Sequence, residues 1–189
     1  MAFDDDHGPW IQTFTGKRFH LFDPSPDEVC IEDIAHALSN ICRFGGHCLT
    51  HLSVAEHSVT VSRHVRPSLA LPALLHDAPE AYIGDIVTPL KQAFYARGGL
   101  GLMERSILDA IHAALRVAQP DIEERREIKR ADVSAYLAEK RDLFAHPAEE
   151  PQYGDCIADT EKVVPLPPGE ACNLFLTRFR ELTKGSALG

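Results

Sequence analysis

Charged groups directly follow an apolar run in one short stretch of the chain, residues 74–91 (LLHDAPEAYIGDIVTPLK). This arrangement limits how the chain can fold. His76 and Asp77 are adjacent there, and Glu80 and Asp85 follow closely. Imidazole and carboxylate groups lose hydration when they are buried, and a buried carboxylate must be paired, hydrogen-bonded or bound to a metal. A divalent cation satisfies both groups at once. The stretch therefore predicts a metal site whose remaining ligands come from elsewhere in the chain.

Periodic patterns on either side of this stretch predict the other elements. Residues 10–22 alternate apolar and polar positions around a Thr-Gly-Lys turn, which is typical of a short β-hairpin. We expect Pro79 to kink or interrupt the helix that carries the His-Asp pair, because proline has no backbone N–H. Start signals and apolar residues at helical spacing predict helices after Ser53 and Pro67, and others at residues 31–41, 88–96, 100–115, 121–144 and 170–182.

Residues 145–169 are rich in proline and acidic residues, and we expect an irregular segment there with a short strand near Val163. The last helix then completes the C-terminal part, residues 145–189. The predicted fold class is all-α, a helical bundle with a small N-terminal β-hairpin. A chain of 189 residues fits one domain, residues 1–189.

Composition excludes several classes of partner. Nineteen basic against 28 acidic residues give a net charge of −9, which argues against binding to a nucleic-acid polymer. No apolar run approaches the ~20 residues of a membrane span, and the N-terminus has no apolar signal segment. Five cysteines without a CxxC spacing indicate thiols in a reducing compartment. We therefore expect a cytoplasmic protein with no membrane association.

Two further polar residues are expected to point inward from predicted helices. His57 lies near the start of the helix after Ser53, close to its apolar face. Asp132 shares a face of the helix at 121–144 with Ile128 and Ala135. Either residue alone is more often a structural core group. With the His-Asp pair they form a mixed nitrogen and oxygen set, which suits one divalent transition metal (Mn, Co, Zn, Fe or Ni) and leaves positions for water and substrate.

The ligand pattern H57…H76-D77…D132 resembles that of the HD-domain metal-dependent phosphohydrolase superfamily. Three segments are similar to its bacterial and phage branch, which includes the 5′-deoxynucleotidases: SVAEHSVTVSRHV, LLHDAPEAYIGDIVTPLK and KRADVSAYL. The similarity spans about residues 31–144. It implies an HD fold, hydrolysis of nucleotide phosphoesters, and one divalent metal bound by His57, His76, Asp77 and Asp132.

The resemblance also implies roles for residues around the metal. Glu80 falls on the family acid beside the metal-bound water, where it would orient or deprotonate that water. Asp85 falls on the acid that accepts a hydrogen bond from the sugar hydroxyl. Arg43 matches an arginine that contacts the phosphate, a task suited to a guanidinium group. Glu80, Asp85 and Arg43 are thus the predicted catalytic residues.

Further residues are expected to contact the substrate. Phe44 lies where relatives often have a tryptophan near the base; it can stack but has no N–H to donate. Thr88 and Lys91 follow in the same loop as Asp85 and are expected to contact sugar or phosphate. His47 lies close to Arg43 in sequence and is expected to line the pocket. Together with Arg43 and Asp85, these residues form the predicted substrate-binding set.

The function expected from this resemblance is hydrolysis of the 5′-phosphomonoester of a (deoxy)nucleoside monophosphate, a small-molecule substrate. Three alternatives stay open: a (deoxy)nucleoside triphosphohydrolase or pyrophosphohydrolase, a guanosine polyphosphate hydrolase, and a non-catalytic nucleotide-sensing module. The resemblance and the amphipathic last helix also allow a homodimer.

Overall fold

The N-terminal residues form the small sheet of this otherwise helical protein. The computed structural model describes residues 4–95, 98–148 and 153–184. Strand β2 (Gly8–Gln12) pairs antiparallel with β3 (Arg18–His20), which confirms the predicted hairpin. A further short strand, β1 (Asp4–Asp5), pairs with β2 and was not predicted. In the hairpin turn, the N–H and hydroxyl of Thr15 donate to Asp33, which ties the sheet to the first helix.

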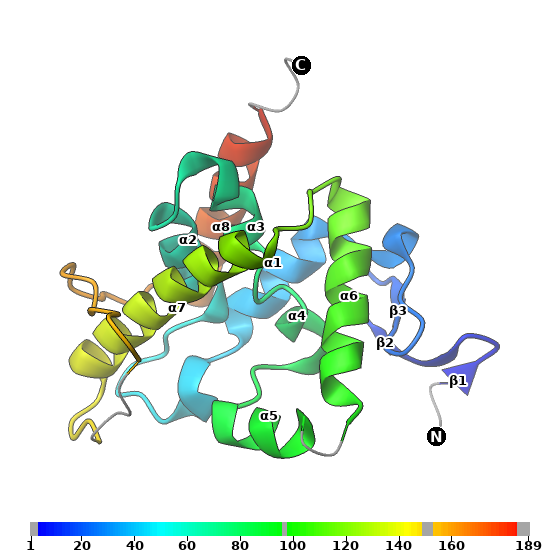
Figure 1. Ribbon diagram of the computed structural model, residues 1–189. Helices are drawn as coiled ribbons and strands as arrows, with labels where there is room; N and C mark the ends of the chain where they lie inside the picture. Colours follow the sequence, from blue (N-terminus) through cyan, green and yellow to red (C-terminus); the bar gives the residue numbers. More distant parts are fainter. Residues whose placement is uncertain (1–3, 96–97, 149–152, 185–189) are drawn as a thin grey trace.

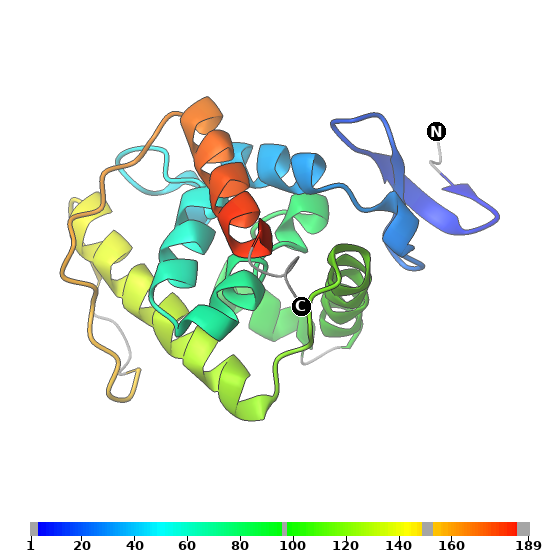
Figure 2. The ribbon, with the colours of Figure 1, turned by 90° about the horizontal axis from the view of Figure 1, so that it is seen from above.

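Four helices form the centre of the core. They are α1 (Ile31–Asn40), α2 (Val54–Arg63), α3 (Ala70–Leu74) and α8 (Pro168–Lys184). Figure 2 shows α8 lying across the other three, and its residues Ala171 and Phe175 are fully buried among them. The apolar face of the last helix therefore belongs to the core, and it gives no support to a homodimer interface.

The remaining helices lie around this centre (Figure 1). They are α4 (Glu80–Ile83), α5 (Thr88–Tyr95), α6 (Leu100–Leu115) and α7 (Ile122–Leu143). Short 3-10 turns at Pro26–Glu28, Arg43–Gly46 and Pro67–Leu69 connect several elements. The all-α class and the helix positions predicted from periodicity are confirmed. Within the described ranges, no helix combines the length and apolar character that a bilayer crossing requires.

The structure corrects one local prediction. His76 and Asp77 do not lie on a helix, because α3 ends at Leu74 and α4 begins only at Glu80. Pro79 has no N–H with which to continue the helical hydrogen bonds. The chain forms tighter turns instead, in which the Ala78 N–H donates to the Leu75 carbonyl at 3.0 Å and the Glu80 N–H donates to the Asp77 carbonyl at 3.0 Å. Gly84, with φ 80°, ends α4.

The segment between α7 and α8 is irregular in its described residues, as predicted, but it contains no strand near Val163. Its backbone bonds to α7 rather than to another strand. The Val163 N–H donates to Asp142 Oδ2 at 2.9 Å, and the Ile157 carbonyl accepts from the Ser134 hydroxyl at 2.7 Å. Both partners belong to α7, so this segment, residues 153–167, runs along that helix (Figure 2). We call it the C-terminal strap.

Candidate metal centre and its cavity

Helix α2 fixes the position of His57. The start signal at Ser53 forms a capping box: Ser53 Oγ accepts from the Glu56 N–H at 3.2 Å, and Glu56 Oε2 accepts from the Ser53 N–H at 3.1 Å. The two bonds set the residue at which the helix starts. His57 follows in the first turn and is only 1% exposed. The sequence therefore places this imidazole inside the protein through a local signal.

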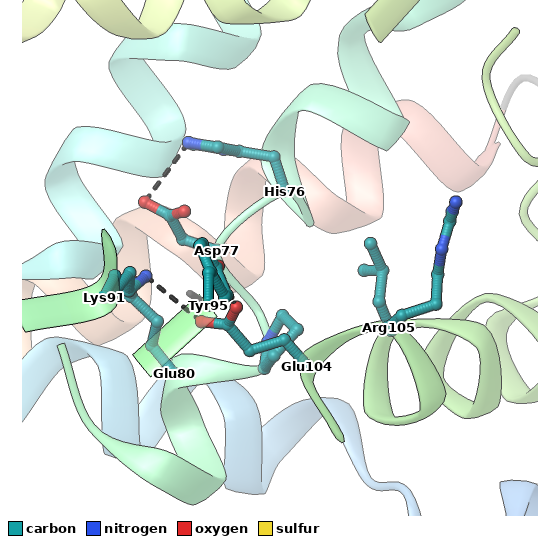
Figure 3. A pocket seen from close by; sticks show the side chains of 9 residues that line it. His76, Asp77, Glu80, Lys91, Tyr95, Glu104 and Arg105 are labelled. Atoms are coloured by element: carbon teal, nitrogen blue, oxygen red, sulfur yellow. Dashed lines mark hydrogen bonds and ion pairs between the residues drawn. The ribbon is translucent and has the colours of Figure 1, made fainter. Parts of the chain in front are cut away.

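The four predicted metal ligands meet at one place. His57 Nε2 lies 3.1 Å from Asp132 Oδ1 and 3.7 Å from Asp77 Oδ2. His76 Nε2 lies 3.2 Å from the same Asp77 oxygen (Figure 3). One ligand atom each from His57, His76 and Asp132 lie within 4.8 Å of one another. The groups come from α2, α7 and the turn before α4, rather than from three helices.

The hydrogen bonds of the two imidazoles leave the nitrogens that face the cluster available. His76 Nδ1 lies 2.8 Å from the Ala73 carbonyl, and His57 Nδ1 lies 2.7 Å from Glu139 Oε1. Because these oxygens accept, each Nδ1 carries the hydrogen. Both Nε2 atoms are buried and have no hydrogen-bond partner of good geometry among the described residues. Metal-binding histidines show this arrangement, so the donor set fits a divalent metal ion.

The charges of the cluster perturb each other strongly. Burial opposes ionisation of Asp77, but His76 and His57 outweigh it and hold the pKa of this carboxyl well below its usual range. Asp132 has its pKa lowered in the same way, mainly by its contact with His57. Burial and Arg43 oppose protonation of His57, yet Glu139 and Asp132 raise its pKa to about 9. Without a metal, a protonated His57 therefore offsets part of the negative charge.

A cavity of about 870 Å³ opens beside the cluster. Its volume is typical of small-molecule sites. Asp77, Glu80 and Asp132 contribute to its wall. All the residues predicted to bind substrate also line it, namely Arg43, Phe44, His47, Asp85, Thr88 and Lys91. The structure thus brings the predicted residues together, while their individual roles stay predictions.

Glu80 combines burial with an available oxygen atom. Its Oε1 accepts from Lys91 Nζ at 2.8 Å (Figure 3), whereas its buried Oε2 has no partner in the described part of the chain. Burial, with Asp77 and Asp85, raises the pKa of Glu80 to about 8, although Lys91 lowers it. Lys91 also lies 3.3 Å from Glu104, at a smaller adjoining cavity of about 290 Å³. A carboxylate with this pKa is suited to accept a proton near neutral pH.

Glu139 is a residue of the site that the sequence interpretation missed. Its side chain is almost fully buried, with Oε1 on His57 Nδ1 at 2.7 Å and Oε2 on Arg43 Nε at 2.8 Å. One carboxylate thus joins a predicted metal ligand to the predicted phosphate-binding arginine. A signal for it exists in the sequence: Glu139 follows Asp132 by seven residues, about two turns along the same face of α7.

Comparisons with known proteins assign this all-α protein, which contains a His/Asp cluster, to a family. The chain is 38% identical over 179 residues to the uncharacterized protein YfdR of Escherichia coli (strain K12), covering 93% of this chain and 96% of YfdR. An uncharacterized protein of Rhodobacter capsulatus is 40% identical over 141 residues, 68% of this chain and 70% of that protein. No family model matches. The chain belongs to the family of YfdR.

Proposed function

We propose that the protein is an HD-type, metal-dependent phosphohydrolase that cleaves the 5′-phosphomonoester of (deoxy)nucleoside monophosphates. One observation carries the proposal: two imidazoles, whose Nε2 atoms are buried and available, face two carboxylates beside a cavity that contains Arg43 and Lys91. The cluster supplies metal ligands, and the cavity supplies cations for a phosphate. This combination supports phosphoester hydrolysis better than structural metal binding, which leaves no room for a substrate.

His57, His76, Asp77 and Asp132 would hold the metal. A divalent transition metal bound there would supply Lewis-acid chemistry: it would polarise a phosphoryl oxygen and would lower the pKa of bound water toward ~7. In this proposal Glu80 accepts the proton of the attacking water through Oε2, which has no partner among the described residues, and Lys91 orients the carboxylate through Oε1. These roles divide the site into a metal-binding part and a proton-accepting part.

Arg43 binds the phosphate in this proposal. Glu139 engages its Nε, which orients the guanidinium group and leaves the terminal N–H groups for phosphate oxygens. The guanidinium is nearly buried, and NH1 lies 3.9 Å from Asp77 Oδ2, so a bound phosphate would lie beside the metal ligands. Positive charge held at that point stabilises the charge that grows on the phosphate in the transition state.

A second candidate is hydrolysis of a (deoxy)nucleoside triphosphate. Three cationic side chains line the same cavity, namely Arg43, Lys91 and Lys129. Lys129 Nζ lies 2.6 Å from Asp132 Oδ2, next to the cluster. Several cations at one site favour a longer phosphate chain than a single phosphate requires. The products distinguish the two reactions, because only the first releases orthophosphate in a single step.

The test is product analysis over a panel of ribo- and deoxynucleotides with Mn, Co, Zn and Mg. We expect metal-dependent release of orthophosphate from monophosphates; release of pyrophosphate or tripolyphosphate would favour the second candidate. No product from any nucleotide would favour a sensing module.

Variants then separate the two parts of the site. His76→Ala should lose bound metal and activity together, whereas Glu80→Ala should keep the metal and lose roughly 10²–10⁴-fold in rate. His146→Ala removes an exposed histidine and serves as the matched control. An Asp132→Ala protein with full metal content and full turnover would contradict the assignment.

A further inference from the structure

Aromatic side chains form a distinct part of the cavity wall. Phe44, Tyr136, Phe144 and Tyr153 all line the cavity that contains the carboxylates of the cluster. Their rings touch one another, with centroid separations of 5.6 Å for Phe44 and Tyr136, 5.0 Å for Phe44 and Phe144, and 5.9 Å for Tyr136 and Tyr153. We call these four residues the aromatic wall.

The wall lies at a fixed spacing from the cluster. Tyr136 follows Asp132 by four residues on α7, which places it about 6 Å further along the same face of the helix. A phosphate beside the cluster and a planar ring at Tyr136 would therefore be separated by a distance that a pentose can span. The spacing matches the order of groups in a nucleotide: phosphate, sugar, base.

Phe44 has an unfavourable backbone conformation at its position in the aromatic wall. Its φ is 59° and its ψ is 26°, the left-handed region that side chains with a Cβ rarely adopt. Gly45 follows with φ 58°, so the chain turns sharply after Arg43. The turn lets Arg43 and Phe44 both face the cavity, with the guanidinium 5.3 Å from the ring centroid. Such a conformation at a cavity wall points to a function in binding.

Tyr153 reaches the wall from the C-terminal strap. The strap is held on α7, where the Asp159 N–H donates to the Ser134 carbonyl at 3.1 Å, and at the C-cap of α2, where Asp159 Oδ2 lies 2.9 Å from His64 Nε2. The tyrosine is nevertheless 37% exposed, so its ring is accessible to a ligand in the cavity. The strap therefore adds a residue to a site whose other members come from residues 43–144.

We propose that the aromatic wall binds the nucleobase of the substrate by stacking, with Tyr153 of the strap as a specificity-determining residue. This inference rests on the proposed function, and it deepens it by naming the part of the substrate that the wall recognises. Every base presents a π-face, and stacking on aromatic side chains is the common means of holding it. The protein should therefore prefer a nucleotide to a sugar phosphate that lacks a base.

The experiment compares two ligands on three proteins. Binding of a deoxynucleoside 5′-monophosphate and of 2-deoxyribose 5-phosphate is measured by calorimetry on metal-loaded Glu80→Gln protein, alone and with Tyr153→Ala or Tyr153→Phe added. Tyr153→Ala should weaken nucleotide binding about tenfold and leave sugar phosphate binding unchanged. Tyr153→Phe should keep the nucleotide affinity, because the ring is retained.

The baseless ligand serves as the folding control. Equal losses for both ligands would show that Tyr153 only supports the structure, and an unchanged nucleotide affinity in Tyr153→Ala would show that the wall does not contact the base; either result overturns the inference. Turnover is measured separately on the protein with Glu80 intact. Tyr153-dependent nucleotide binding without hydrolysis would refute the proposed activity alone, whereas hydrolysis with no preference for a base would refute the inference alone.

Discussion

The carboxylate of Glu139 is the group whose loss should most clearly reveal how the site is organised. In Glu139→Ala both of its contacts disappear, to His57 Nδ1 at 2.7 Å and to Arg43 Nε at 2.8 Å. In Glu139→Gln the amide oxygen can still accept from one partner, but the NH₂ group then meets an N–H of the other. Each variant therefore perturbs the proposed metal ligand His57 and the proposed phosphate-binding residue Arg43 together.

The magnitude follows from the kind of bond that is lost. A hydrogen bond to a charged group contributes roughly 1.5–3 kcal/mol, and loss of a group that orients a metal-binding histidine typically costs roughly 10–100-fold in metal affinity. We expect a loss of that size in both variants. Nucleotide binding should weaken as well, because Arg43 loses the partner that orients it.

Metal affinity is measured by competition with a chelator, and nucleotide affinity by calorimetry at saturating metal. Glu123→Gln on the same helix is the matched control, because that side chain is 76% exposed and should change neither affinity. Circular dichroism verifies that the variants fold. If folded Glu139→Ala bound the metal as tightly as the unaltered protein, Glu139 would not position His57.

Three further predictions concern protonation. In the metal-free protein the pKa of His57 is raised to about 9, so metal binding at neutral pH should release a proton, and the metal affinity should increase as the pH rises. Calorimetry in buffers of different ionisation heat measures the proton release, and metal binding without it would contradict this prediction. The pKa of Glu80 is raised from 4.5 to about 8, so between these pH values the metal-free folded state holds a proton that the unfolded state loses, and the stability contribution of this residue falls as the pH rises. Glu80→Gln should therefore raise Tm by an amount that grows with pH, and a difference that stays constant would refute the shift. Burial lowers the pKa of His112 below 6.5, so the contribution of this residue to folding stability is present above that pH and is lost as the pH falls. His112→Leu should therefore raise Tm mainly in acid, and an equal change in Tm at every pH would count against this cause.

Local signals were sufficient to predict that two of the four candidate metal ligands point inward. The capping boxes at Ser53 and Asp121 are both formed, and they fix the start of α2 and α7. Once the start of a helix is known, its periodicity decides which side chains point inward. His57 and Asp132 could therefore be assigned to the interior from neighbouring residues alone, without knowledge of how the helices pack.

Contacts between distant residues could not be predicted in this way. Glu139 is 82 residues from His57 and 96 from Arg43, and nothing local in the sequence pairs them. Tyr153 lies in a segment without periodicity, whose path depends on hydrogen bonds to side chains of α7. His76 and Asp77 do lie with His57 and Asp132, as predicted, but not on a helix, because Pro79 interrupts the helical hydrogen bonds there.

If the site binds a metal as proposed, one carboxylate would also link the order of folding to metal uptake. Glu56 Oε2 accepts from Ser53 at the start of α2, while its Oε1 accepts from the Leu166 N–H at 2.7 Å, 110 residues further along the chain. The helix start that sets the position of His57 thus gains its full support only after the last part of the protein has docked. An incompletely folded chain should hold its imidazoles too loosely to retain an ion, so metal retention would report that the whole chain has reached its final arrangement.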